Sequence, residues 1–112
     1  MTPSSESRAK TVYIVQILLP VFDNEGRAFD ASRYTEVRTE LADRFGGLTA
    51  YSRAPAEGIW GDEGEFKRDD IVVFEVMVEK LDRDWWSSYR KALEQRFRQD
   101  SIMMRVLASE VL

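Results

Sequence analysis

Three segments of this chain are apolar almost without interruption, and they constrain its fold more than any other feature. Seven of the eight residues in 12–19 are apolar, as are seven of eight in 71–78 and six of seven in 102–108. Their valine and isoleucine content predicts β-strands. A strand in which apolar and polar residues do not alternate is buried on both faces. Both sides of the predicted sheet therefore need cover.

Two segments with the 3.6-residue period of a helix alternate with these strands. Each begins after an aspartate that can accept hydrogen bonds from free backbone N–H groups, and each has an apolar residue at every third or fourth position. The expected helices are 30–45, capped by Asp30 and ended by Gly46-Gly47, and 82–98, capped by Asp82 or Asp84. Glu94 and Arg98 are expected to pair on the second helix, four residues apart.

A short fourth strand is expected at 48–53, so the elements follow the order β-α-β-β-α-β. Two strand–helix–strand halves in succession are typical of the ferredoxin-like α+β sandwich. The predicted fold is a four-stranded antiparallel sheet in the order 4-1-3-2, with strands numbered along the chain and both helices on one face. Residues 1–10 are expected to form a flexible N-terminal tail, and 11–112 a single domain.

The sheet face without helices would expose an apolar patch larger than monomeric proteins usually tolerate. A second copy of the same sheet, related by a two-fold axis, would cover it. We therefore expect a homodimer.

Each of the three apolar strands contains one polar exception, and these are Gln16, Glu75 and Arg105. With strand 1 between strands 4 and 3, the three side chains could form a row across the sheet. They should point away from the helices, because an unpaired charge beneath a helix layer is costly. Tyr51 and Arg53 share one parity on the second strand and could extend the row.

Two interpretations of this row remain open. It could be a buried polar network that fixes the register of a dimer, or it could line a small-molecule pocket, between sheet and helices or between two sheets. In the second case Arg105 or Arg53 would hold a carboxylate or enolate oxygen. Glu75 would be the only credible general base. Trp60 would either close over the cavity or clamp its own loop.

Composition excludes several classes of function for this chain acting alone. It contains neither cysteine nor histidine, so thiolate chemistry, serine–histidine hydrolysis, histidine-ligated haem and the usual zinc sites are ruled out. We expect no cofactor and no metal. The net charge of −4 and the lack of a basic cluster argue against nucleic acid as a partner. The polar N-terminus does not resemble a signal peptide, and no apolar run could span a membrane, so a cytoplasmic location is expected.

The pattern FGGLTAY at 45–51, GIW at 58–60, the apolar strand 71–78 and the helix from Trp86 to Gln99 resembles small, uncharacterised bacterial ferredoxin-like domains. These are similar to the dimeric α+β barrels, which include cofactor-free monooxygenases, muconolactone isomerases and chlorite-dismutase-like haem proteins. The family has no established activity to carry over, and the leading hypothesis is a homodimeric α+β barrel that binds a small organic molecule between sheet and helices. The alternatives are an enzyme of the monooxygenase or isomerase type and an interaction module without a pocket. The lack of histidine departs from the haem branch.

Overall fold

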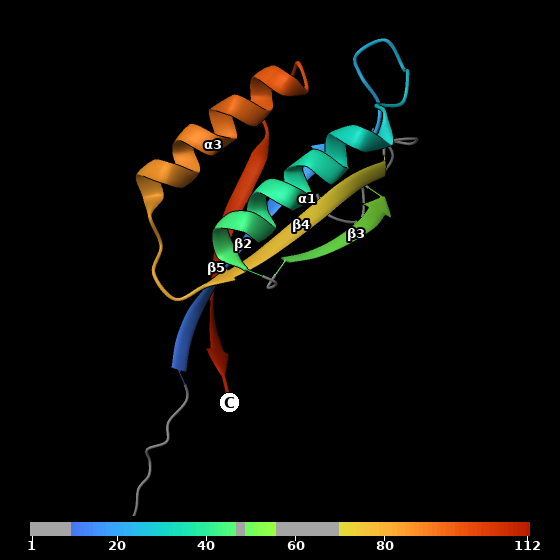
Figure 1. Ribbon diagram of the computed structural model, residues 1–112. Coiled ribbons are helices and arrows are strands. Elements are labelled where there is room, and N and C mark those ends of the chain that lie inside the picture. Colours follow the sequence, from blue (N-terminus) through green and yellow to red (C-terminus); the bar gives the residue numbers. More distant parts are fainter. Residues whose placement is uncertain (1–9, 47–48, 56–69) are drawn as a thin grey trace, which may run out of the picture.

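The computed structural model describes residues 10–46, 49–55 and 70–112. The elements in chain order are β2 (Lys10–Pro20), α1 (Ala31–Phe45), β3 (Thr49–Pro55), β4 (Asp70–Val78), α3 (Arg83–Arg96) and β5 (Met103–Val111). Both helices lie on the same side of the sheet (Figure 1). The predicted tail lies outside the described residues except for Lys10, which begins β2.

Backbone pairing joins the strands into one antiparallel sheet of four, in the order β3-β4-β2-β5. Numbered along the chain, this is the order 4-1-3-2. β3 lies at one edge of the sheet, beside β4, and the sheet and the two helices form an α+β fold.

β3 differs in composition from the other strands. Its seven residues, TAYSRAP, include no valine, isoleucine or leucine, and they end at a proline, which cannot donate a backbone hydrogen bond. The buried core that the structure describes takes its strand residues from β2 and β4, joined by Ile102 just before β5.

The first helix begins and ends as its sequence predicts. The Asp30 carboxylate accepts a hydrogen bond from the Ser32 N–H at 3.2 Å and caps the N-terminus of α1. At the other end Gly46 adopts φ 79°, and its N–H donates to the Ala42 carbonyl at 2.7 Å. A positive φ costs little for glycine because it has no Cβ. Asp30 and Gly46 therefore set the length of α1.

The second helix begins as predicted at Asp82, whose carboxylate accepts from the Trp85 N–H at 3.1 Å. It ends at Arg96, two residues earlier than expected. The predicted pair of Glu94 with Arg98 is therefore wrong, because Arg98 lies beyond the last turn. Glu94 is instead 3.6 Å from Arg90, one turn before it on the same helix.

A Schellman motif ends α3. The Gln99 N–H donates to the Glu94 carbonyl at 2.9 Å, and the Arg98 N–H donates to the Gln95 carbonyl at 3.2 Å. These two bonds satisfy carbonyl groups that the helix end leaves free. Arg98 takes the left-handed position of the motif, with φ 51°. Glycine usually occupies this position, so an arginine there is strained.

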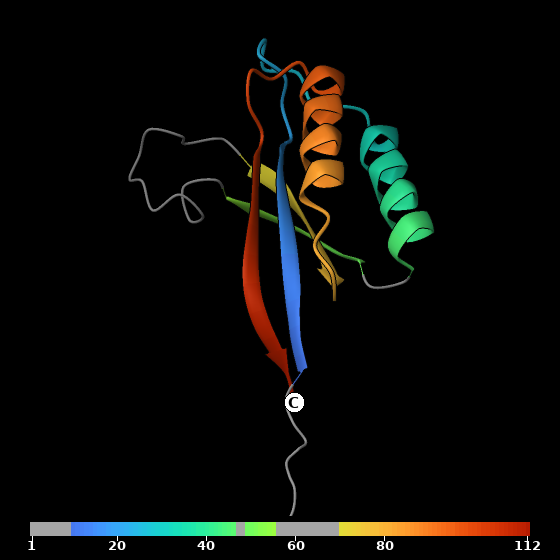
Figure 2. The same cartoon turned by 90° about the vertical axis from the view of Figure 1, so that its left-hand side faces the viewer.

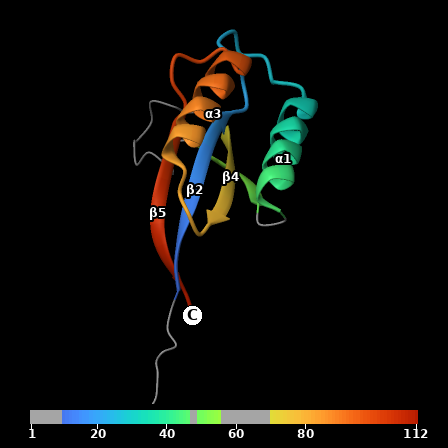
Figure 3. The same ribbon diagram turned by 60° about the vertical axis from the view of Figure 1, so that its left-hand side comes forward.

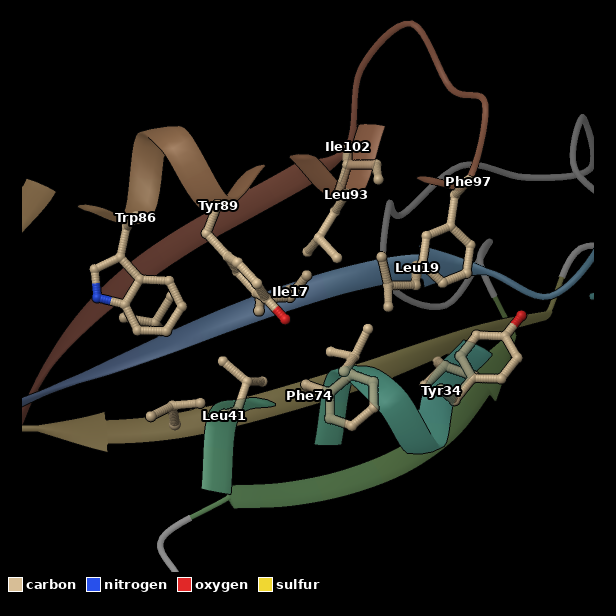
Figure 4. Packing of buried hydrophobic residues seen from close by; sticks show 14 of the residues in the cluster. Ile17, Leu19, Tyr34, Leu41, Phe74, Trp86, Tyr89, Leu93, Phe97 and Ile102 are labelled. Atoms are coloured by element: carbon tan, nitrogen blue, oxygen red, sulfur yellow. The ribbon is translucent and has the colours of Figure 1, made fainter. Parts of the chain in front are cut away.

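The main core lies between the two helices and the sheet (Figure 4). Its largest fully buried side chains include Phe74 from β4 and Phe97 at the end of α3. The Phe97 ring packs edge-on against Phe29 at 5.0 Å between centroids. The buried members drawn from β2 all have the same parity and are Val15, Ile17 and Leu19. That parity defines which face of β2 the helices cover.

β2 and β5 pair over most of their length, from Leu18 opposite Met103 to Lys10 opposite Val111. The two strands extend together past the ends of the helices (Figure 2). In this part of β5, Leu107 and Val111 are 43% and 42% exposed. The extension leaves apolar side chains of the sheet uncovered by the chain's own helices.

Candidate functional site

The predicted polar row forms on the sheet face that carries no helix. In the strand register Gln16 lies opposite Glu75 on one side and opposite Arg105 on the other. Its neighbours Val15 and Ile17 belong to the core beneath the helices. Because successive side chains of a strand point to opposite faces, Gln16 and its two partners face away from α1 and α3. The prediction that these three residues form one row is confirmed.

Hydrogen bonds join the three side chains directly. The Gln16 amide nitrogen, Nε2, donates to Glu75 Oε2 at 2.5 Å. Arg105 Nε donates to the Gln16 oxygen, Oε1, at 2.6 Å. The glutamine thus bridges a carboxylate and a guanidinium, and their charges fix the orientation of its amide. Gln16 and Glu75 are half-buried and Arg105 is exposed in the single chain.

Two residues predicted to extend the row do not lie in register with it. β4 pairs with β3 so that Ala50 is opposite Glu75, while Tyr51 is opposite Phe74 and Arg53 is opposite Val72. Directly opposed residues in an antiparallel pair share a face of the sheet. The strand positions of Tyr51 and Arg53 therefore alternate with that of the row, and the prediction for them is wrong. Trp60 lies outside the described residues.

Apolar side chains flank the row on its own face. Toward one end of the sheet Leu18, Ile71 and Val73 form a second buried cluster, with Met103 packed against it. This end is already covered within the chain. Toward the other end the same parity includes Ile14 and Met77, both half-buried, and the exposed Leu107. Val12, which has the parity of Gln16 on β2, is only 2% exposed, so the uncovered part of the face lies beyond the row on β5, at Leu107 and Val111.

Four cavities lie within the described part of the chain and are lined by residues other than Gln16, Glu75 and Arg105. A general base needs a substrate within hydrogen-bonding reach. In this structure the Glu75 carboxylate is bonded to Gln16 instead.

A second polar cluster, which the sequence analysis missed, joins the two helices. Glu40 of α1 accepts two hydrogen bonds from the Arg96 guanidinium, both at 2.9 Å, and one from the Tyr89 hydroxyl at 2.7 Å. Glu36, one turn earlier on α1, is 3.8 Å from Arg96. These contacts bridge residues about fifty positions apart in sequence. No local pattern in either helix predicts them.

The cluster shifts the ionisation of its members. Burial raises the pKa of Glu40, but the hydrogen bonds from Arg96 and Tyr89 outweigh that effect and place the pKa below its ordinary value of 4.5. Burial, followed by the hydrogen bond to Glu40, raises the pKa of the Tyr89 hydroxyl well above its ordinary value of 10.0. At neutral pH Glu40 is therefore a carboxylate and Tyr89 a neutral donor, which suits a helix-to-helix clamp.

Aromatic rings surround this clamp. Trp85 stacks on Tyr89 at 5.0 Å and meets Phe45 edge-on at 5.3 Å between centroids. The Arg44 guanidinium lies 4.3 Å from the Trp85 ring centroid, within cation–π range. These contacts hold the C-terminal end of α1 against the first half of α3. The cluster is filled by its own members and serves packing.

Comparisons with family models, with curated proteins and with solved structures found no match. The resemblance to small bacterial ferredoxin-like domains therefore stays a prediction. Within the described residues, no helix is long and apolar enough to cross a membrane. The candidate site is accordingly argued from the geometry of the row alone.

Proposed function

We propose that this chain acts as a self-associating module, in which the helix-free sheet faces of two copies pack together. The observation that carries the proposal is the row of Gln16, Glu75 and Arg105 beside the exposed Leu107 on the same face. Burying the apolar part of this face against a second copy is favourable. The charged row can then fix the position of that copy through complementary charges.

The charges of the row are arranged for a two-fold contact. Glu75 and Arg105 lie at opposite ends, with the neutral Gln16 between them. A two-fold axis near Gln16 would bring Arg105 of each copy toward Glu75 of the other. A two-fold interface must be self-complementary, and this row meets that requirement.

The structural interpretation of the row is favoured over a catalytic one. The three side chains satisfy one another by hydrogen bonds, and the four cavities described above are lined by other residues. A base poised for proton abstraction from an organic molecule would need space beside its carboxylate. We therefore assign the row to register and specificity between copies, and not to chemistry.

The test is the mass of the particle in solution for two variants of adjacent residues. Leu107→Arg places a charge on the proposed interface, whereas Val106→Arg places it on the opposite face at a site of similar exposure, 40% against 43%. By light scattering and sedimentation from about 1 to 200 µM, the unmodified chain and Val106→Arg should be dimers. Leu107→Arg should be a folded monomer, because burying an unpaired charge is costly.

Two results would overturn the proposal. The first is an unmodified chain that stays monomeric throughout that concentration range. The second is a dimer that Val106→Arg dissociates and Leu107→Arg does not, since this would place the contact on the helix side or elsewhere. Circular dichroism of each variant separates loss of the dimer from loss of the fold.

A further inference from the structure

A cavity on the helix-covered side of the sheet suggests a binding site that does not depend on self-association. It lies between α3 and the strands β2 and β5, with a volume of about 190 Å³. α3 crosses over these two strands on the helix-covered face (Figure 3). Its apolar wall includes Val15, Trp86 and Met104, which belong to or pack against the main core. This wall suits the body of a small apolar ligand.

The polar wall of the same cavity comes from one face of α3. Arg83, Ser87 and Arg90 all line it, and residues spaced by four and three lie above one another on a helix. Two arginines and a serine thus line a space whose other lining residues are apolar. This is the composition of a small-molecule site, in which a few polar groups orient an apolar ligand.

The arginines have unused capacity to donate hydrogen bonds. Arg90 Nε is buried and has no hydrogen-bond partner. Its nearest charged neighbour, Glu94 Oε2, is 3.6 Å away, beyond hydrogen-bonding distance. Among the residues that the structure describes, Arg83 forms no ion pair. Arg90 thus has one long ion pair on its own helix and Arg83 has none with a described residue, so their charge is available to an anionic ligand.

We propose that this cavity binds a small organic carboxylate with a single aromatic ring or a branched aliphatic body. The guanidinium groups match a carboxylate in both charge and geometry. The size is also suitable, because an apolar cavity of roughly 150 Å³ accommodates benzene. The volume here is sufficient for one ring and its carboxylate but too small for a nucleotide or a fatty acid.

Benzoate is the probe, and benzyl alcohol is its uncharged counterpart of similar shape. Binding is followed by ¹H–¹⁵N chemical shifts of the unmodified chain. For benzoate we expect a Kd of about 1 mM or tighter, as befits a ligand of this size, with the largest shifts at Trp86 and Ser87. Benzyl alcohol should bind at least about ten-fold more weakly, because it cannot satisfy the arginines.

Matched variants locate the site. Arg83→Gln should weaken benzoate binding by about ten-fold. Lys91→Gln removes the same charge from the same helix outside this cavity and should leave binding unchanged. Arg90→Gln tests the other arginine that lines the cavity. If the Arg90→Gln protein fails to fold, Arg83→Gln still tests the site, because Arg83 is exposed.

The proposal fails if benzoate causes no shifts up to about 10 mM, or if benzyl alcohol binds equally well. Equal weakening by Arg83→Gln and Lys91→Gln would also overturn it, since it would indicate general attraction to a basic surface. Benzoate binding should persist in Leu107→Arg, because Leu107 lies on the opposite face. The result is thus independent of whether the chain dimerises.

Discussion

At the scale of single residues, the clamp formed by Glu40, Tyr89 and Arg96 is the most specific polar contact between the helices. A salt bridge at the surface contributes little, but a carboxylate that accepts two parallel bonds from one arginine is better ordered. The side chains of Arg96 and Glu40 are 31% and 37% exposed. Solvent screening therefore reduces what the clamp contributes to the free energy of unfolding.

Glu40→Gln should lower that free energy by about 1 kcal/mol at pH 7. The folded-state pKa of Glu40 is depressed, so its stabilising effect is present above its ordinary pKa of 4.5 and is lost as pH falls through the folded value. The gap between the unmodified chain and the variant should therefore narrow as the pH falls below 4.5. Urea unfolding at a series of pH values measures it.

Glu36→Gln is the matched control, because Glu36 lies one helical turn from Glu40 and touches Arg96 only at 3.8 Å. It should change the free energy of unfolding by less than about 0.5 kcal/mol. If both variants show the same small loss at every pH, Glu40 does not clamp the helices.

The row and the clamp differ in how far the sequence could predict them. Gln16, Glu75 and Arg105 interrupt apolar strands, so their positions are visible in the sequence, and strand order then brings them together. Glu40 and Arg96 lie among other charged residues on exposed helix faces, and nothing marks them. The error for Tyr51 and Arg53 came from register, because a shift of one residue moves a whole strand's side chains to the other face.

At the scale of the elements, each helix is followed by a residue with positive φ, but the residue type differs. Gly46 adopts φ 79° after α1, and Arg98 adopts φ 51° after α3. The Gly46-Gly47 pair made the first end predictable, whereas no glycine marks the second. The predicted end of α1 was therefore accurate, whereas the predicted end of α3 lay two residues too far along the chain.

Arg98→Gly should raise the free energy of unfolding by about 0.5–1 kcal/mol. It removes the steric cost of a left-handed residue, and the greater entropy of glycine in the unfolded chain offsets part of the gain. Arg98→Ala retains the Cβ and the strain, and should give no increase. Thermal unfolding of the three proteins compares them directly, and a loss of stability in the glycine variant would contradict the strain argument.

At the scale of the whole molecule, the sheet has one face covered by helices and one covered only in part. Sequence alone predicted this asymmetry, because the strands are apolar on both faces and the chain has two helices. It could not show that Leu18, Ile71 and Val73 are already buried within the chain. That burial depends on contacts distant in sequence, and it confines the proposed interface to the row and the strand ends beyond it.

Exchange of the two charges in the row tests how the copies are oriented. Arg105→Glu should weaken the dimer by at least about ten-fold, because it sets like charges against each other across the two-fold axis. Combining it with Glu75→Arg restores opposite charges in both the chain and the interface, and should recover the dimer. Sedimentation at several concentrations measures the dimer dissociation constants of the single and the double variant. A double variant no tighter than the single one would show that the row does not meet its own copy.

The pairing of Lys10 with Val111 has a consequence for how this fold could be used. Opposed residues in neighbouring strands are only about 5 Å apart, so the chain enters and leaves the sheet at one place. A link of a few residues would close the domain into a ring, and new termini could then be cut at a surface turn. By the same geometry, a single loop of a host protein could carry the whole domain as an insertion without its own two ends being forced apart.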